Sequence, residues 1–204
     1  MKRLIEGFRR FRESYDRDHR QVFEELAERG QSPSAMVVAC SDSRVDPQLI
    51  FGAGPGEIFV VRNVANLIPP YAPDGHYHGT SAALEFAVLS LQVPNVIVLG
   101  HARCGGIGAL LERGDEARDD FVSAWMHIAR PARDRALAAA GGEPAQAQHL
   151  CEHEAIKVSL DNLLTFPWVR ERVEGGTLRL HGWYFDIVTG AVTALGPHGT
   201  FEPL

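Results

Sequence analysis

The sequence predicts an α/β fold: a mainly parallel central β-sheet with flanking helices and an N-terminal helical arm. Three observations predict it. Three short apolar runs have the length of strands that are buried on both faces. Segments with helical spacing alternate with these runs, which is typical of parallel α/β proteins. A long amphipathic segment precedes the first run. We expect residues 1–204 to form one domain, with residues 1–30 as the arm.

The first third of the chain contains the arm and the first strand. Residues 5–29 carry apolar side chains at three- and four-residue intervals, which indicates a helix that ends at Gly30. Residues 36–39 form an apolar run that ends at Cys40 and is predicted to be a buried strand. Asp46 followed by Pro47 is typical of a helix start, with the aspartate as N-cap.

The middle of the chain continues the alternation. Residues 58–61 and 96–100 read as the second and third buried strands. A loop rich in proline and glycine separates the second strand from a helix predicted over residues 79–91. Another helix is predicted from Gly105 to Leu111. Polar residues that could bind or react with a ligand directly follow the second and third predicted strands.

The last part of the chain is predicted to close the fold. Residues 115–148 are expected to be helical with a break at Gly141–Gly142, and residues 151–164 to be helical again. Residues 177–185 alternate as a strand does, and residues 191–195 are predicted to form a closing antiparallel strand.

Composition excludes several function classes. The formal net charge is −6, so no bulk basic surface is available for nucleic acid or an anionic membrane. No apolar run reaches the length of about 18 residues that a transmembrane helix needs, and the first residues lack a secretory h-region. Of three cysteines, two have a better use than a disulfide, which favours a reducing cytoplasm.

Cys40, His101 and Cys104 form the most informative pattern in the chain. Two thiolates and one imidazole make a zinc ligand set with a free fourth position, which is typical of a catalytic zinc. Taken singly, each residue would be interpreted as a buried thiol or a loop histidine. Cys40 follows one predicted parallel strand, and His101 and Cys104 follow another. In such sheets, ligands bind beyond the carboxyl ends of the strands. We therefore predict one zinc ion per chain.

The spacing around Cys40 disfavours other cysteine chemistry. A cysteine phosphatase loop needs an arginine six positions later, where this chain has Asp46. The chain contains no Cys-x-x-Cys pair of the thioredoxin kind. A papain-like pair would leave Cys104 without a role.

Asp42 and Arg44 lie two residues apart and directly follow the first predicted ligand. If the backbone is locally extended they point to the same side, where a bidentate ion pair would keep Asp42 ionised and fixed. Such an aspartate has two possible roles. It can accept a hydrogen bond from zinc-bound water, or it can bind zinc as a fourth ligand and close the site.

Three motifs together resemble the β-class carbonic anhydrases. They are Cys-Ser-Asp-Ser-Arg at 40–44, Arg-Asn-Val-Ala-Asn at 62–66 and Gly-His-Ala-Arg-Cys-Gly-Gly at 100–106. The resemblance extends from about residue 30 to 111 and resumes at 151–172 and 180–190.

This resemblance implies zinc on Cys40, His101 and Cys104, with Asp42 as a ligand only in a closed form. It implies a zinc lyase, a carbonic anhydrase, that catalyses CO₂ + H₂O ⇌ HCO₃⁻ + H⁺ by attack of zinc-bound hydroxide oriented by Asp42 and Arg44. It also implies a homodimer or a multiple of dimers. In such assemblies the N-terminal helices wrap the partner and the sites lie at the interface.

The resemblance further suggests a plant-type-like sub-family. Gln31 matches a glutamine that hydrogen-bonds the substrate oxygen there. Phe59, Val64, Phe86 and Gly105 are the expected substrate pocket, and Phe86 stands where plant-type members have tyrosine.

A second sub-family carries a tryptophan three positions before the first cysteine, as part of a non-catalytic bicarbonate site that closes the enzyme. This chain has Val37 at that position, although Arg62 matches the arginine of the site. We therefore expect an open enzyme without bicarbonate inhibition of this kind.

Two other functions remain open. A hydrolase of the same fold acting on CS₂ or COS would use the same zinc chemistry. A non-catalytic zinc-binding module would keep the ligands but has no use for Asp42, Arg44 and Gln31.

The remaining histidines are weaker candidates. His149, Cys151 and His153 alternate on a predicted helix, where positions two apart face different ways, so structural or surface roles are favoured. His76 and His78 flank a loop and could assist proton transfer to buffer. His181, on a predicted strand, is interpreted as structural.

Overall fold

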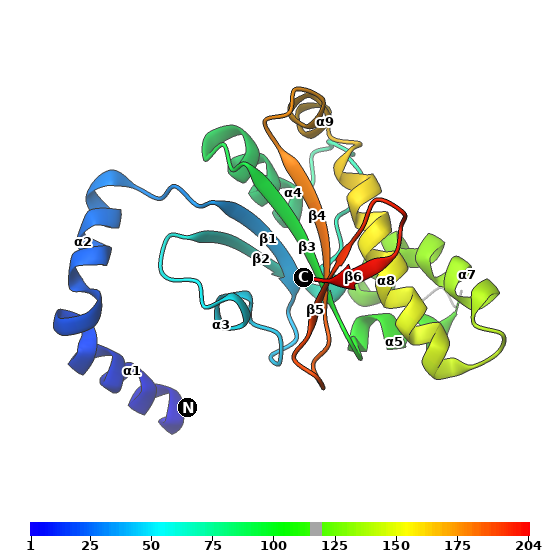
Figure 1. Cartoon of the computed structure of the whole chain (residues 1–204), viewed down its shortest axis with the longest axis horizontal. Coiled ribbons are helices and arrows are strands. Elements are labelled where there is room, and N and C mark those ends of the chain that lie inside the picture. The colour runs from blue at the N-terminus through cyan, green and yellow to red at the C-terminus, as the bar shows by residue number, and fades with distance from the viewer. Residues whose placement is uncertain (115–119) are drawn as a thin grey trace.

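The computed structural model describes residues 1–114 and 120–204. A six-stranded sheet forms its centre, and helices α5, α7 and α8 lie together on one side of it (Figure 1). The N-terminal helices α1 and α2 stand apart on the other side as an arm. The predicted α/β class, with a mainly parallel sheet, flanking helices and an N-terminal arm, is confirmed.

The strand order across the sheet is β2-β1-β3-β4-β5-β6. Four strands run parallel to one another: β1 (Ala35–Cys40), β2 (Ile58–Asn63), β3 (Asn95–His101) and β4 (Arg179–Phe185). The predicted closing strand β5 (Val192–Leu195) is antiparallel to β4. A further strand, β6 (Phe201–Pro203), pairs with β5 and was not predicted; three residues are too few for a periodic pattern.

The helices of the first half follow the predicted order. The arm consists of α1 (Lys2–Ser14), a π-helical turn over Tyr15–His19 and α2 (Arg20–Arg29). Helix α3 (Pro47–Phe51) has the predicted N-cap, because a carboxylate oxygen of Asp46 accepts from the backbone N–H groups of Gln48 and Leu49. The next two helices are α4 (Gly79–Glu85), continued by a π-helical turn over Phe86–Ser90, and α5 (Gly105–Arg113).

From residue 120 to the start of β4 the regular elements are all helical. It contains α6 (Phe121–Met126), a 3₁₀ turn over His127–Ala129, α7 (Arg130–Ala139), α8 (Pro144–Leu163) and α9 (Pro167–Glu174). The predicted break lies between α7 and α8, where Gly141 and Gly142 both have positive φ. The helix predicted from residue 115 begins outside the described residues.

Helix α8 packs directly across the centre of the sheet. A Cβ atom on Gly100 of β3 would lie 2.6 Å from Ile156 of α8, and one on Gly182 of β4 would lie 2.8 Å from the same side chain. Larger residues at either glycine would push the helix away. This close contact fixes the position of α8 relative to the ends of β3 and β4.

Strand β2 departs from the prediction of a strand buried on both faces. Most of its residues are only half-buried, because β2 is the edge strand of the sheet. An apolar run of this length fits a central strand and an edge strand equally well.

Helices α1 and α2 contain no fully buried residue, although Leu26 of α2 lies against Gly56. Five large apolar side chains of the arm are exposed: Leu4, Ile5, Phe8, Phe11 and Val22. No helix of the described part of the chain is long and apolar enough to cross a membrane.

Candidate metal centre

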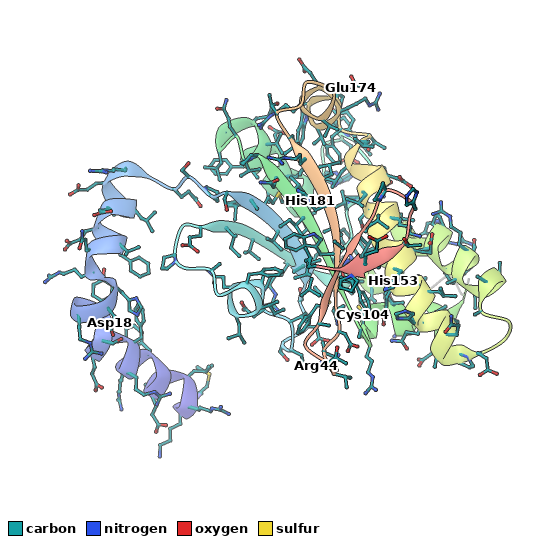
Figure 2. The ribbon with its side chains drawn as sticks, viewed as in Figure 1. Asp18, Arg44, Cys104, His153, Glu174 and His181 are labelled. Carbon is teal, nitrogen blue, oxygen red and sulfur yellow. The ribbon has the colours of Figure 1, made fainter. Side chains whose placement is uncertain are left out.

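The three predicted metal ligands meet at one end of the sheet. Cys40 ends β1, His101 ends the neighbouring strand β3, and Cys104 is the N-cap of α5. One ligand atom from each residue lies within 4.8 Å of the other two, and all three residues are buried. Figure 2 shows Cys104 and Arg44 at this same end of the sheet.

The histidine is prepared to bind a metal through Nε2. Its Nδ1 lies 2.9 Å from the carbonyl oxygen of Ala102, so Nδ1 carries the proton and donates it. The buried Nε2 has no hydrogen-bond partner among the described residues. A buried polar atom without a partner is costly. A second hydrogen bond that fixes the tautomer is usual for a metal-binding histidine.

The surroundings favour loss of the proton from Cys40, and Cys104 then holds its own proton more tightly. A hydrogen bond from the Cys104 thiol lowers the pKa of Cys40, despite burial. The backbone N–H groups of Asp42 and Ala65 also stabilise the Cys40 thiolate. The adjacent thiolate in turn raises the pKa of Cys104. Cys104 lies at the N-terminus of α5, where the helix dipole favours negative charge.

Two thiolates and a neutral imidazole are a donor set that suits zinc. The cluster comprises Cys40, His101 and Cys104 and does not include the Asp42 carboxylate. Three ligands leave the fourth tetrahedral position free, which is characteristic of catalytic sites. The residues at this centre therefore fit a bound zinc ion.

Asp42 and Arg44 form the predicted ion pair. The Arg44 Nε donates to Oδ1 at 2.9 Å, and its Nη2 donates to Oδ2 at 2.6 Å. The backbone N–H of Arg44 adds a third hydrogen bond to Oδ1 at 2.9 Å. Arg44 thereby holds the pKa of Asp42 well below its usual range. Arg44 also donates to the carbonyl of Arg103, which links this loop to the one that carries Cys104.

Arg62 supports the loop after Cys40, a role that the sequence reasoning missed. Its guanidinium donates to the carbonyl oxygens of Cys40 at 2.9 Å and Asp42 at 2.7 Å. It also contacts the Asp46 carboxylate at 3.3 Å. The clue to this role was the position of Arg62 near the end of β2, because that end lies beside the end of β1.

Two of the predicted pocket residues lie beside the cluster. Gly105 directly follows Cys104, and a Cβ atom on the next residue, Gly106, would lie 2.8 Å from Val64. The backbone at Val64 is fixed by Trp125, whose indole N–H donates to the Val64 carbonyl at 2.8 Å. The following Ala65 has a φ of +61°, a strained value for a residue with a side chain.

The other predicted site residues lie elsewhere in the chain. Phe59 and Phe86 pack together, with ring centroids 6.0 Å apart. Phe59 is four residues before the end of β2, which is about 13 Å along a strand. Gln31 precedes β1 and so lies towards the opposite end of that strand from Cys40. A single chain therefore does not bring these three residues to the metal ligands.

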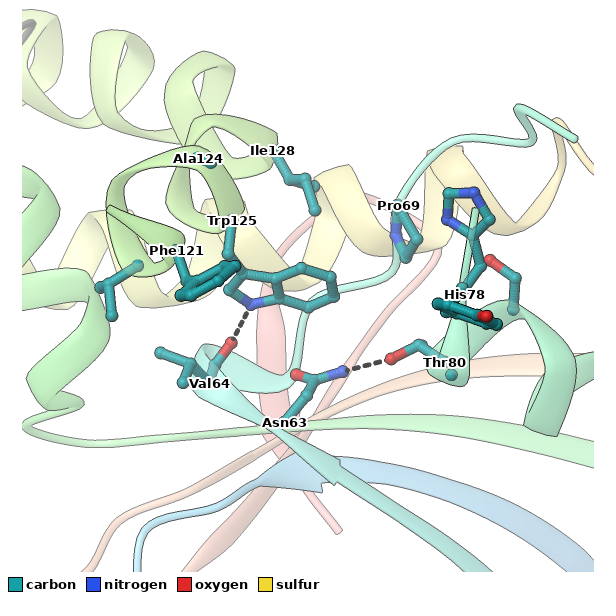
Figure 3. A pocket seen from close by; sticks show the side chains of 13 residues that line it. Asn63, Val64, Pro69, His78, Thr80, Phe121, Ala124, Trp125 and Ile128 are labelled. Atoms are coloured by element: carbon teal, nitrogen blue, oxygen red, sulfur yellow. Dashed lines mark hydrogen bonds between the residues drawn. The ribbon is translucent and has the colours of Figure 1, made fainter. Parts of the chain in front are cut away.

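A cavity of about 670 Å³ lies next to Val64 (Figure 3). Its lining is mainly apolar and includes Trp125. Asn63, which is paired with Cys40 across the sheet, donates to Thr80 at 3.2 Å in the wall of this cavity. His78 also lines the cavity, and its Nε2 lies 2.7 Å from the Asp74 carboxylate.

The remaining histidines do not form a second metal cluster with Cys151 among the described residues. The rings of His149 and His153 lie 4.3 Å apart on one face of α8, whereas Cys151 is buried in the core. His181 is hydrogen-bonded to Asn95 across the sheet at 3.0 Å, in agreement with a structural role.

Glu152 is a residue of this centre that the sequence reasoning did not identify. It is buried on α8, and its carboxylate accepts a hydrogen bond from the backbone N–H of Cys104 at 2.9 Å. An acidic residue on the buried face of a helix was the only signal that the sequence offered.

Comparisons with known proteins agree on one family. A family model described as carbonic anhydrase matches residues 35–192. The β carbonic anhydrase 5 of Arabidopsis thaliana chloroplasts is 41% identical over 191 residues. The match covers 92% of this chain but only 61% of that relative, so the chain spans about three-fifths of its length.

Two solved structures extend the comparison. The β-carbonic anhydrase CcaA superposes with a TM-score of 0.92 at 37% identity, covering all of this chain and 92% of that one. A tetrameric β-carbonic anhydrase from Sordaria macrospora superposes with a TM-score of 0.82 at 27% identity, covering 96% of each chain.

Proposed function

The chain belongs to the β-class carbonic anhydrases, and from this premise we propose that it hydrates CO₂ reversibly to bicarbonate and a proton. The observation that carries the proposal is the meeting of Cys40, His101 and Cys104, with the Nε2 of His101 buried and without a hydrogen-bond partner among the described residues. These three side chains would hold one zinc ion. When bound, zinc supplies the Lewis acidity that lets a water molecule ionise near neutral pH.

Asp42 would orient the attacking water. An ionised carboxylate only accepts hydrogen bonds. It can therefore accept one from the O–H group that the water keeps after ionisation, which turns a lone pair of the water oxygen towards CO₂. Arg44 keeps the carboxylate ionised and holds it in one direction through two parallel hydrogen bonds. Because both Asp42 oxygens accept from Arg44, this geometry favours the open site over the closed form with Asp42 as a ligand.

We infer that the substrate pocket is completed in a homodimer or a multiple of dimers. The exposed apolar face of the arm and the half-buried edge strand β2 support a large contact with a second copy. The tetrameric relative supports it as well. A partner arm would bring Gln31 towards a neighbouring metal centre, and Phe59 and Phe86 would line the same interface beside Val64 and Gly105.

Inhibition by bicarbonate at a non-catalytic site is not expected. Position 37 is a valine, buried in β1, so the tryptophan of that site is missing. Arg62, the other matching residue, already donates to the carbonyl oxygens of Cys40 and Asp42. We also retain a reducing cytoplasmic setting as a proposal, supported by three free and buried cysteines.

Stopped-flow CO₂ hydration by the zinc-loaded protein from about pH 6.5 to about pH 9 tests the function, because this range brackets the expected ionisation of the water. Fast hydration near neutral pH is the expected result. Turnover of CS₂ or COS without CO₂ hydration would support the hydrolase. Zinc binding without turnover of any of the three would indicate a non-catalytic zinc module, against which the intact Asp42–Arg44 pair argues.

A further inference from the structure

We propose that Glu152 is a positioning residue for the zinc ligand Cys104. The inference rests on the proposed function, because it assigns Glu152 a role towards the zinc site. One carboxylate oxygen, Oε1, accepts from the Cys104 backbone N–H at 2.9 Å and from the Gln148 side chain at 3.1 Å. The other, Oε2, accepts from the Tyr184 hydroxyl at 2.8 Å.

The Cys104 backbone depends on this hydrogen bond. As the N-cap of α5, Cys104 has an N–H group that receives no partner from its own helix. The preceding Arg103 has a φ of +55°, so the chain turns sharply just before the ligand. The hydrogen bond to Glu152 fixes the peptide plane before Cys104, which constrains the direction of the Cα–Cβ bond that carries Sγ.

Glu152 can position another residue because it is itself held in place by burial and hydrogen bonds. Glu152 is only 4% exposed, and Ile156, one helical turn later, packs against Gly100 and Gly182 of the sheet. Burial, together with the nearby Glu152 carboxylate, raises the pKa of Tyr184, so the tyrosine keeps its proton and donates it. The carboxylate is thus held from α8 by Gln148 and from β4 by Tyr184.

A role in packing alone does not explain an acidic residue here. Burying a carboxylate is costly unless its hydrogen bonds are satisfied, and an apolar side chain would fill the same space at lower cost. The three donors satisfy it, and one of them belongs to a metal ligand. Residues that hydrogen-bond metal ligands commonly change metal affinity about 10- to 100-fold when they are replaced.

Glu154 provides a matched control on the same helix. It lies two residues further along α8 and pairs with Arg135 at 3.1 Å and Lys157 at 2.7 Å. The hydrogen bonds of Glu154 go to these two side chains instead of to Cys104. Glu154→Gln therefore tests the loss of an acidic charge from α8 without the proposed contact.

The test measures zinc affinity by chelator competition, and the cobalt–thiolate absorption of the Co²⁺-substituted protein. Glu152→Met should weaken zinc binding by about 10- to 100-fold and alter the cobalt–thiolate band. Glu152→Gln should stay within about threefold of the unsubstituted protein, because its amide oxygen still accepts from Cys104. Glu154→Gln should behave as the unsubstituted protein. Unchanged affinity and spectrum in Glu152→Met would overturn the proposal, as would equal losses in Glu152→Met and Glu152→Gln.

Tyr184→Phe decides the matter if Glu152→Met does not fold, as judged by circular dichroism. It removes only the hydroxyl that orients Oε2, and zinc binding should weaken by about three- to tenfold. Unchanged binding in a folded Tyr184→Phe protein would overturn the inference. Failure of the unsubstituted protein to bind zinc would instead refute the proposed function, so the two failures are distinguishable.

Discussion

The guanidinium of Arg44 faces the carboxylate of Asp42 in a fork, with N–O distances of 2.9 and 2.6 Å. This relationship makes Asp42 a fixed, charged acceptor beside the metal ligands, and it leads to the first prediction. Asp42→Asn has the same shape, but its amide places N–H donors against Arg44. CO₂ hydration should fall about 100-fold or more, the scale of a lost proton acceptor, while zinc content stays unchanged. Stopped-flow assays with metal analysis test this, and full activity in Asp42→Asn would contradict the proposed role.

The same ion pair predicts the pH range of activity. Arg44 lowers the pKa of Asp42, so the carboxylate is ionised at and above neutral pH and remains paired with arginine. Activity should therefore persist down to about pH 7, the usual ionisation range of a zinc-activated water. Activity only at clearly alkaline pH would indicate that Asp42 leaves Arg44 and binds the metal.

The metal ligands could be predicted from the sequence because they follow directly from strand order. Cys40 and His101 end two parallel strands, and the ends of such strands share one edge. Glu152 could not be predicted, because nothing in the sequence links it to Cys104, 48 residues away. Their contact depends on how α8 crosses the sheet, which is set by the close approach of Ile156 to two glycines.

Other differences arise from what lies outside a single chain. The apolar run of β2 indicated a strand but did not reveal that the strand lies at the edge of the sheet. Gln31, Phe59 and Phe86 were chosen by resemblance, and one chain leaves them away from the metal ligands. Their proposed role depends on a second copy.

Two adjacent glycines after Cys104 offer a matched pair of substitutions. A Cβ atom on Gly106 would lie 2.8 Å from the Val64 side chain and 3.1 Å from the Ala65 Cβ, whereas one on Gly105 would have no neighbour within 4 Å. Overpacking costs about 1–3 kcal/mol, whereas replacing glycine by alanine stabilises a helix by up to about 1 kcal/mol. Gly106→Ala should therefore lower the free energy of unfolding by about 1–2 kcal/mol and weaken zinc binding.

Gly105→Ala should leave the unfolding free energy unchanged or raise it slightly, because the added methyl group has space. Urea denaturation of both variants, with chelator competition for zinc, provides the measurement. Equal stability of the two variants would show that Val64 and Ala65 yield easily to the added methyl group.

The arm predicts an assembly that charge can disrupt. Phe8 on α1 is 61% exposed, and we expect a second copy of the chain to cover this apolar side chain. Phe8→Asp should shift sedimentation towards the mass of one 22.4 kDa chain and lower CO₂ hydration, because Gln31 would no longer reach a partner site. Val188→Asp, at an exposed residue beyond β4, is the control and should keep the assembly. An unsubstituted protein that sediments as a single chain would contradict the dimer.

His153 predicts a loss of stability in acid that is separate from the metal centre. Burial, with nearby His149 and Lys157, lowers its pKa to about 4, whereas Glu154 opposes the shift. Its Nε2 has no hydrogen-bond partner among the described residues, and its ring stacks on Phe201 at 4.1 Å. The folded protein therefore keeps this ring neutral. In the unfolded chain the ring takes up a proton below about pH 6.5.

The direction of the effect follows from these two pKa values. Between about pH 6.5 and about pH 4 the unfolded chain binds one more proton at residue 153, so the stability from the neutral ring is lost as the pH falls. The leucine of His153→Leu cannot bind this proton in either state. The quantity to compare is the unfolding free energy of the unsubstituted protein minus that of His153→Leu. This difference should decrease by about 1–2 kcal/mol from about pH 7 to about pH 4.5, a range that allows for solvent screening of a half-buried ring. Urea denaturation measures it, and zinc loss in acid affects both proteins alike. Parallel stability curves for the two proteins would show that His153 accepts a proton as readily in the folded state as in the unfolded chain.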